Sequence, residues 1–498
     1  MDYWLSVIFI LVFSTVNCQE VTNTHVAAYT LTTIPSNSKN GEKLEKTTDV
    51  PKVPYMCTVC SCTDEIIDCG NRRLTKLFEN YQWPNKTIKE VSFKKNLFVH
   101  LTTFPRVEIW KLTLQANRIV KIDNRAFKPL INLTELDLSY NQLTGEVLSP
   151  SVFEGKFSDT AYEPLSKLVV LNLAHNMIKS LHQDFFEHMP NLKTLNVSGN
   201  SFSTIDNRTT VALSSLPFLE ELDLSYCSLK TISDFSSFKN LKMLDLSGNR
   251  LTTPPVVLGK ALNLQILYLD ENPIQIINYM HPFPRMPKLK ELSLCCMPHL
   301  TIVGKGAFSG LPVLEHLRVQ NCPKLESIDE YALASQSPSG GLLHPPMKKL
   351  DLSDNALRYL PQLFVARWDW LEELNLMNNK WSCDCDNQYL ISTIVPKYLT
   401  KMMDDSISLL TCATPPEHAG KTLMSLSNRT LRCLDLNGAR PEKDATILIG
   451  MLLGLLLAIP VCLTIFVFWR RGFFFCGPQG PASFSRAFYK RAPDNGEL

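Results

Sequence analysis

The feature that most constrains this 498-residue chain is a short apolar motif that recurs along most of its length. The motif reads L-x-x-L-x-[LV]-x-x-N, and its clear copies end at Asn141, Asn176, Asn200, Asn249, Asn272, Asn355 and Asn379. Weaker copies end at Asn96, Asn117, Cys227, Met297 and Cys322, which makes twelve units spaced by 21–27 residues except for two longer steps. Such a period predicts one extended array of stacked units.

The spacing inside each unit predicts a short strand. In L-x-[LV], the two apolar side chains point to one face and the residue between them points to the other. Stacked units bury these side chains in a continuous core beside a parallel sheet. The recurring Asn can donate and accept hydrogen bonds where the chain turns back. We expect Phe127, Phe185, Phe308 and Phe364, in the return segments, to fill the outer side of the core.

Over residues 85–380 this pattern resembles the leucine-rich repeat family. The resemblance implies an α/β solenoid, in which a curved horseshoe carries a parallel inner β-sheet. The alternative is an ordinary α/β domain with Leu-rich strands, which does not require twelve ordered copies.

Eight of the 15 cysteines cluster at the two ends of the array, within residues 56–84 and 381–433. These clusters resemble the N- and C-terminal caps of extracellular leucine-rich repeat proteins such as Slit and Toll, although Lys380 stands where the family has Pro. The resemblance implies the pairs Cys57–Cys62, Cys60–Cys69, Cys383–Cys412 and Cys385–Cys433, whereas the spacing alone leaves the connectivity open. A zinc site is the alternative, and an oxidising secretory route favours disulfides.

Four further cysteines lie within the repeats. Cys227 and Cys322 occupy the Asn position of their units, and we expect them to be structural. Cys295 and Cys296 are adjacent, at the edge of the inner face. We expect two partly buried free cysteines there, and the alternatives are a free reactive thiol or an unusual bridge.

The ends of the chain predict a membrane protein. Residues 1–18 resemble a secretory signal peptide, although Asp2 stands where Lys or Arg is usual. Residues 446–469 form an uncharged run long enough to cross a bilayer core of about 30 Å, and we place a transmembrane helix at 445–469. Arg470 and Arg471 follow it and favour a cytoplasmic C-terminus. We therefore expect a single-pass plasma-membrane protein with an extracellular N-terminus.

The remaining segments are short. Residues 19–55 are rich in Thr and Ser and are expected to form a disordered leader, and 434–444 to form a stalk. The tail at 470–498 is too short for an enzymatic or Toll/interleukin-receptor domain, and Cys476 in it is a candidate for palmitoylation. Insertions at 145–164 and 334–346 are rich in Ser, Pro and Gly and predict irregular loops.

No catalytic motif is visible in the sequence, such as a Gly-rich phosphate loop, H-E-x-x-H or G-x-S-x-G. We therefore expect a protein that is not an enzyme and needs no cofactor. Basic and acidic residues balance over the expected ectodomain, which argues against nucleic-acid binding. Residues 86–128 are the basic exception, and we hypothesise that this end meets an anionic partner such as heparan sulfate. The basic residues there are Lys86, Lys89, Lys94, Lys95, Arg106, Lys111, Arg118, Lys121, Arg125 and Lys128.

The inner sheet is the main candidate for binding, because each strand presents one central residue outward. In chain order these residues are Ser92, Thr113, Asp137, Asn172, Asn196, Asp223, Asp245, Tyr268, Ser293, Arg318, Asp351 and Asn375. An aromatic side chain among charges is a plausible anchor, so we assign ligand binding to Glu221, Asp223, Asp245, Tyr268, Asp270 and Arg318. The alternative is a solvated face, since Asp is common in L-D-L-S segments of this family.

Five N-x-[ST] sequons, at Asn85, Asn132, Asn196, Asn207 and Asn428, are candidates for glycosylation. By the period-two argument, Asn196 points out from the inner sheet. A glycan there would divide the sheet, and we hypothesise that a partner binds the later repeats or a flank.

As a whole the arrangement resembles single-pass cell-surface leucine-rich repeat proteins of the kind typified by Capricious, Tartan and trophoblast glycoprotein. This implies a receptor or adhesion molecule that recognises an extracellular protein ligand or cell-surface receptor, either another molecule or a second copy of itself. The alternative is a co-receptor or decoy that modulates another signalling receptor, with the tail mainly an anchor.

Overall fold

The computed structural model describes residues 54–154, 156–158, 161–163, 165–232, 238–400, 405–433 and 441–471. The expected signal peptide at 1–18, nearly all of the leader, residues 434–440 of the stalk and Cys476 lie outside the described residues.

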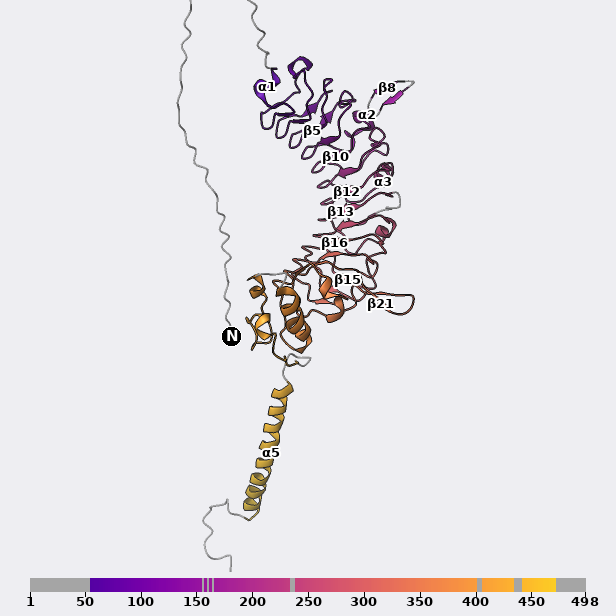
Figure 1. Cartoon of the computed structure of the whole chain (residues 1–498). Coiled ribbons are helices and arrows are strands. Elements are labelled where there is room, and N and C mark those ends of the chain that lie inside the picture. Colours follow the sequence, from indigo (N-terminus) through magenta and orange to yellow (C-terminus); the bar gives the residue numbers. More distant parts are fainter. Residues whose placement is uncertain are drawn as a thin grey trace, which may run out of the picture. The chain divides into compact units, whose positions relative to one another are not determined.

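The repeats form one long sheet along one side of the array (Figure 1). Within the described residues the sheet has fourteen strands, of which β1 and β2 come from the N-terminal cap and the other twelve from the repeats. β1 pairs antiparallel with β2, and every later neighbour is parallel. In order the strands are β1 (Ser61–Cys62), β2 (Ile66–Asp68), β3 (Glu90–Ser92), β5 (Lys111–Thr113), β7 (Glu135–Asp137), β10 (Val170–Asn172), β11 (Thr194–Asn196), β12 (Glu221–Asp223), β13 (Met243–Asp245), β14 (Ile266–Tyr268), β16 (Glu291–Ser293), β18 (His316–Arg318), β22 (Lys349–Asp351) and β23 (Glu373–Asn375).

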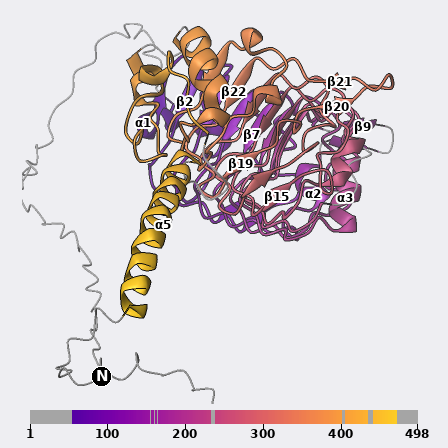
Figure 2. The ribbon, with the colours of Figure 1, turned by 90° about the horizontal axis from the view of Figure 1, so that it is seen from below.

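The return segments form the other side of each coil. They contain two small parallel sheets, β4–β6 and β15–β17–β19, together with α3 and several short 3₁₀ turns. Figure 2 shows this division, with β2, β7 and β22 in the inner sheet and β15, α2 and α3 away from it. The elements are β4 (His100–Leu101), β6 (Lys121–Ile122), α3 (Asn207–Ser214), η2 (Val256–Lys260), β15 (Ile276–Ile277), β17 (Ile302–Val303), β19 (Ser327–Ile328), η3 (Gln362–Phe364) and η4 (Trp368–Trp370).

The core lies between these two sides. The middle residue of each three-residue strand in the long sheet is buried, and Leu171, Leu195 and Leu222 pair in register across three neighbouring repeats. The four phenylalanines assigned to the outer core are all buried, which confirms that prediction. Phe127 stacks on Phe153, which in turn meets the edge of Phe185, so the aromatic rings continue from one repeat to the next.

The recurring Asn pairs backbone groups of two repeats at once. The Asn249 amide nitrogen donates to the carbonyl oxygens of Leu246 (2.8 Å) and Leu224 (3.0 Å). Its oxygen accepts from the backbone N–H of Leu229 (2.9 Å) and of Cys227 (3.1 Å). Cys227 is itself a buried free thiol whose Sγ lies 3.4 Å from the carbonyl oxygen of Val197, so the expected structural role is confirmed.

Disulfides close both ends of the array. The N-terminal cap, with α1 (Met56–Val59) and η1 (Asn80–Gln82), has the bonds Cys57–Cys62 and Cys60–Cys69. The C-terminal cap has the bonds Cys383–Cys412 and Cys385–Cys433. These are the pairs that the family resemblance implies, and they leave no thiolates in either cap for zinc. The C-terminal cap contains η5 (Cys385–Asn387), the π-helical η6 (Leu390–Leu399), η7 (Asp405–Leu409) and η8 (Leu423–Leu426).

Two expectations from the sequence are wrong. Cys295 and Cys296 are partly buried as expected, but they are bonded to each other, which is the unusual bridge kept as an alternative and not the expected free pair. Both insertions contain regular elements rather than irregular loops alone. The first has α2 (Pro150–Phe153) and a hairpin of β8 (Lys156–Ser158) and β9 (Ala161–Glu163), and the second has a hairpin of β20 (Ser335–Gln336) and β21 (Leu342–Leu343).

The last described element is α5 (Pro441–Arg470), which includes Pro460. Within it, residues Thr446–Arg470 are long and apolar enough to cross a membrane, by length and composition. This segment matches the run that the sequence singles out.

Candidate protein-binding face

The sheet register places the twelve outward residues in one row across the inner face. In the later repeats, Asp223 pairs with Asp245, Asp245 with Tyr268, Tyr268 with Ser293, and Ser293 with Arg318. The register therefore confirms the row that the strand period predicts, although Ser293 within it is buried. The first residue of each strand faces the same side, since the residue between is the buried one, and this second row includes Glu221, Glu291 and His316.

Carboxylates on β12 to β14 are held by backbone donors rather than by cations. The backbone N–H of Ser225 donates to Asp223 (2.9 Å), and that of Ser247 donates to Asp245 (2.8 Å). Asp270, just after β14, accepts from the backbone N–H of Cys295 in the next repeat (2.7 Å). In the part of the chain that the structure describes, no Lys, Arg or His forms an ion pair with Glu221, Asp223, Asp245, Asp270 or Glu271. We call these five residues the acidic patch.

Asp245 shows the electrostatic consequence. Burial raises the pKa of its carboxyl above the ordinary value, the charges of Asp223 and Asp270 add to the rise, and hydrogen bonds from Ser247 oppose it. The patch therefore holds several negative charges that repel one another and that no fixed cation neutralises.

The acidic residues one step earlier in the chain behave differently. Glu220, directly before β12, lies 2.7 Å from Lys242 and 3.6 Å from Lys193, the residues at the same position in the two neighbouring repeats. Glu315 is bracketed in the same way by Lys348 (2.7 Å) and Lys290 (3.2 Å). Hydrogen bonds from these lysines lower the pKa of both carboxyls. Glu220 and Glu315 are therefore paired with cations, unlike the carboxylates of the acidic patch.

Two tyrosines border the acidic patch. The Tyr268 hydroxyl donates to Glu291 (3.2 Å), and burial raises the pKa of this phenol. The Tyr226 hydroxyl donates to Glu271 (2.9 Å), and about half of this side chain is exposed. The strand pattern of the sequence predicts Tyr268 in the binding row but does not point to Tyr226. Gly248, one repeat later, is the feature of the sequence that could have pointed to Tyr226. The Tyr226 ring occupies the space that a Cβ at Gly248 would need, so a glycine is required there.

Beyond Tyr268 the inner face deepens into an open pocket of about 630 Å³ in the last repeats. Arg318, which is exposed, lies at its wall, next in the row to Ser293. His316 lies 3.7 Å from Glu291, and Lys349 is paired with Glu373. The polar side chains of the lining are Glu291, Ser293, His316, Arg318, Lys349, Asp351, Glu372, Glu373 and Asn375. Arg318 thus belongs to this mixed-charge pocket rather than to the acidic patch.

The ten basic residues of 86–128 do not lie on one face. Four of them form ion pairs: Lys86 with Asp64 (3.9 Å), Lys89 with Glu65 (2.7 Å), Lys111 with Glu135 (3.2 Å) and Arg125 with Glu154 (2.6 Å). Lys111 is on β5 of the inner sheet, whereas Lys121 is on β6 of a return segment. The heparan sulfate hypothesis stays a prediction that would rest on fewer residues, chiefly the exposed neighbours Lys94 and Lys95.

The sequons lie in different settings. Asn196 ends β11, and its side-chain oxygen accepts from the backbone N–H (2.9 Å) and hydroxyl (2.7 Å) of Ser198. Asn207 is the first residue of α3, and Asn132 accepts a hydrogen bond from Lys167 (2.6 Å). Asn85 and Asn428 are exposed. A glycan on Asn196 stays a prediction, and it would stand in the outward row directly beside Asp223.

Comparison with known proteins finds similarity along the repeats. The family described as "Leucine rich repeat" matches residues 108–155 and 166–220, and a two-copy version of it matches 217–256. Mouse CD180 antigen is 33% identical over 168 residues, which are 33% of this chain and 24% of CD180. Chicken Tsukushi is 30% identical over 250 residues, which are 50% of this chain and 61% of Tsukushi. The matches thus span less than two thirds of either relative.

Solved structures are also similar. A chain in the octameric complex of Latrophilin 3, Unc5D and FLRT2 is 19% identical with a TM-score of 0.47, over 76% of this chain and 98% of that one.

Proposed function

Because the chain is a leucine-rich repeat protein, we propose that it recognises a protein partner at the cell surface through the inner sheet of its later repeats. The observation that carries this proposal is the acidic patch, whose carboxylates have no cationic partner among the described residues. Stacked repeats commonly bind partners on an extended concave sheet, and here part of that sheet surface is negatively charged.

The chemistry of the patch selects a partner with a basic surface. Lys and Arg side chains on the partner would relieve the repulsion among Asp223, Asp245 and Asp270. Tyr226 and Tyr268 add aromatic area at the border, and tyrosine is enriched among residues that dominate interface energies. The mixed-charge pocket around Arg318 lies farther along the same face. A partner that extends beyond the acidic patch would also contact this pocket.

Two features support a position at the cell surface. Disulfides close both caps, which is typical of extracellular proteins, and Thr446–Arg470 is a candidate membrane span. We therefore propose a single-pass plasma-membrane protein whose repeats are extracellular. A co-receptor or decoy would use the same face and differ only in what the bound complex does.

Self-recognition is the second candidate, and one observation favours it. Exposed Lys94 and Lys95, early in the array, have no ion pair in the described residues, and the acidic patch lies several repeats later. A contact between the basic end of one copy and the acidic patch of another would be head-to-tail. Such a contact would provide homophilic adhesion between cells.

The test is a binding screen with a matched control. Cells that display the full chain are probed with multivalent ectodomains of secreted and surface proteins, including its own. The test variant is Asp223→Asn/Asp245→Asn, and the control is Glu90→Gln/Asp137→Asn, which removes two charges from the same face near the other end. We expect the test variant to weaken binding about tenfold or more and the control to leave it unchanged.

Equal binding by the wild type and the test variant would overturn the proposed site. An Asn196→Gln variant tests the effect of a glycan in the same screen. Stronger binding by this variant would mean that a sugar on Asn196 restricts access to the inner face. A probe that binds only when Lys94 and Lys95 are intact on one of the two copies would favour self-recognition.

A further inference from the structure

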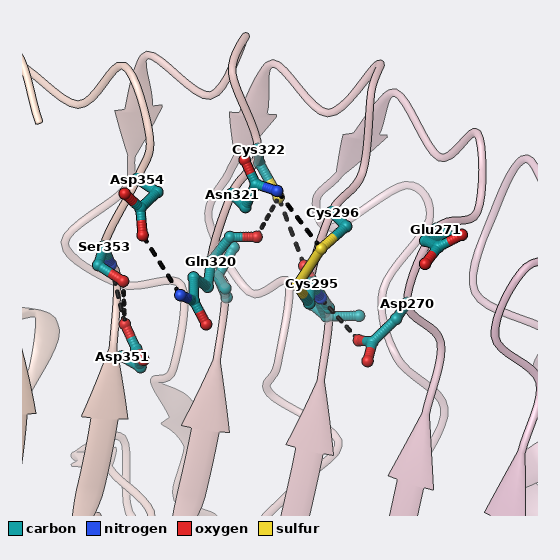
Figure 3. Close-up of a disulfide and its surroundings, with 12 residues drawn as sticks. Asp270, Glu271, Cys295, Cys296, Gln320, Asn321, Cys322, Asp351, Ser353 and Asp354 are labelled. Atoms are coloured by element: carbon teal, nitrogen blue, oxygen red, sulfur yellow. Dashed lines mark hydrogen bonds between the residues drawn. A yellow bond between two sulfur atoms is a disulfide. The ribbon is translucent and has the colours of Figure 1, made fainter. Parts of the chain in front are cut away.

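The bond between Cys295 and Cys296 stands apart from every other cysteine pair in the described residues. It joins sequence neighbours just after β16, and both side chains are partly exposed at the edge of the inner face (Figure 3). In the caps, the Cys60–Cys69 and Cys383–Cys412 bonds join buried cysteines, whereas Cys57, Cys62 and Cys385 are partly exposed and Cys433 is exposed. An external thiol therefore has a more open approach to the adjacent pair than to the buried cap cysteines.

This bond contributes least to holding the fold together. Cap disulfides join residues 5, 9, 29 and 48 positions apart, whereas the adjacent pair closes no loop. A cross-link stabilises chiefly by restricting the unfolded chain, and the effect grows with the length of the closed loop. The Cys295–Cys296 bond is therefore poorly explained by stability.

The turn that carries the pair is fixed by its neighbours. The backbone N–H of Glu271 donates to the Cys295 carbonyl (2.9 Å), and the backbone N–H of Cys296 donates to the Gln320 carbonyl (2.8 Å). The Cys295 N–H also donates to Asp270 (2.7 Å), and the Asn321 amide lies 3.5 Å from the Cys296 Sγ. These contacts do not need the sulfur–sulfur bond, so the turn can keep its place when the bond is opened.

The free thiol in the next repeat does not compete for the bond. Cys322 is buried and its Sγ lies 3.4 Å from the Leu294 carbonyl oxygen. Burial raises the pKa of this thiol to about 11, so very little of the attacking thiolate exists at neutral pH. The buried thiol of Cys322 therefore does not exchange with the adjacent pair.

We propose that Cys295–Cys296 is a thiol–disulfide exchange site on the binding face, whose substrate is an external dithiol. A thiolate of the dithiol attacks one sulfur, the Cys295–Cys296 bond breaks and a mixed disulfide forms. The second thiol of the reagent then releases the protein. The dithiol loses two electrons and two protons and becomes a disulfide, and the protein gains them as two thiols.

The surrounding charge selects the reductant. Figure 3 places Asp270 and Glu271 in the repeat beside the pair, and neither carboxylate has an ion pair among the described residues. A negative field repels thiolates that carry further negative charge and attracts those on a cationic molecule. The favoured substrate is therefore a dithiol on a basic surface, which matches the partner chemistry proposed for the same face.

The first test needs no binding partner, so its outcome is independent of the proposed function. The full chain on cells is treated with dilute dithiothreitol, alkylated with N-ethylmaleimide and mapped by mass spectrometry. We expect Cys295 and Cys296 to be labelled at dithiol concentrations at least about tenfold below those that open the buried Cys60–Cys69 and Cys383–Cys412 bonds. Cys227 and Cys322 should stay unlabelled until the chain is denatured, which provides an internal control.

Labelling of the pair no earlier than the buried Cys60–Cys69 and Cys383–Cys412 bonds would overturn the proposal, and so would labelling without any reductant. A Cys295→Ser/Cys296→Ser variant should lose the early label and keep the disulfides of both caps. If that variant failed to reach the surface, the wild-type order of labelling would still decide the question.

The second test addresses the charge. Cationic cysteamine should open the pair faster than anionic 2-mercaptoethanesulfonate, by about threefold or more after correction for thiolate content, and added salt should reduce the ratio. Asp270→Asn, which keeps an oxygen to accept from the Cys295 N–H, should reduce the ratio as well. A ratio near one that neither salt nor the variant changes would overturn the selection of a basic dithiol.

Discussion

The C-terminal cap and the acidic patch use the same residue types in opposite ways. In the cap, buried Asp384 accepts from the Tyr359 hydroxyl (3.1 Å), the Ser382 hydroxyl and the backbone N–H of Asp386 (3.0 Å). In the patch, Asp245 accepts from Ser247 and faces two like charges. The cap supplies hydrogen-bond donors to the buried carboxylate of Asp384, whereas the patch leaves charge without a cationic partner among the described residues. That difference separates residues that stabilise this fold from residues available for binding.

The largest expected effect separates the two kinds of disulfide. Removing the Cys385–Cys433 bond by Cys385→Ala/Cys433→Ala should lower the free energy of unfolding by about 2–5 kcal/mol, because this bond closes a long loop. Cys295→Ser/Cys296→Ser should cost less than about 1 kcal/mol, because that pair closes none. Denaturant unfolding of the full chain in detergent, followed by circular dichroism, measures both. Equal losses would contradict the distinction.

The next comparison is between the two aspartates. Asp384→Ala should destabilise the cap by about 3 kcal/mol, because it removes the acceptor of the buried Ser382 hydroxyl and of the part-buried donors of Tyr359 and Asp386. Asp245→Ala should change stability little and weaken partner binding. Thermal unfolding and the binding assay are measured on the same two variants. A stability loss at Asp245 as large as that at Asp384 would mean that the patch is structural.

A smaller effect concerns how Tyr226 is held at the border of the patch. Gly248 has a positive φ of 63°, and a Cβ built there would lie 2.3 Å from the Tyr226 ring. Gly248→Ala should cost about 1–2 kcal/mol through backbone strain and displacement of the ring. Adding Tyr226→Ala should restore the part of the lost stability that comes from displacing the ring. A double-mutant cycle measures this part. No recovery would mean that the ring and the glycine are independent.

The smallest expected effect is the pH response of Asp245. Its pKa is raised in the folded state, so the charged carboxylate opposes folding above that pKa, and the penalty is lost once the pH falls below the ordinary value near 3.8. Asp245→Asn should therefore raise stability at pH 7 by less than about 1 kcal/mol, since water screens a partly exposed group. The advantage should shrink towards pH 4 in paired urea titrations. If the stability advantage of Asp245→Asn grew as the pH fell, the pKa of Asp245 would be lowered in the folded state and not raised.

Much of the fold follows from spacing alone. Leu195, Leu222 and Leu244 recur where a strand must turn its apolar side inward, and their burial follows from that period. The outward row followed for the same reason. The insertions were harder to predict, because their Ser, Pro and Gly content indicates turns but does not exclude the short pairs β8–β9 and β20–β21.

The repeat, the row of outward residues and the cysteine clusters at both ends can all be read from the amino-acid pattern, because each depends on spacing within or between units. Which charges are paired, by contrast, depends on the folded arrangement of the repeats. Glu220 and Glu221 are adjacent in sequence, yet Lys193 and Lys242 from the neighbouring repeats neutralise only the first. The Cys295–Cys296 bond and the contact of Tyr226 with Glu271 were decided in the same way. Such contacts depend on local turn geometry and on how repeats more than twenty residues apart align side by side, which a one-dimensional pattern does not contain.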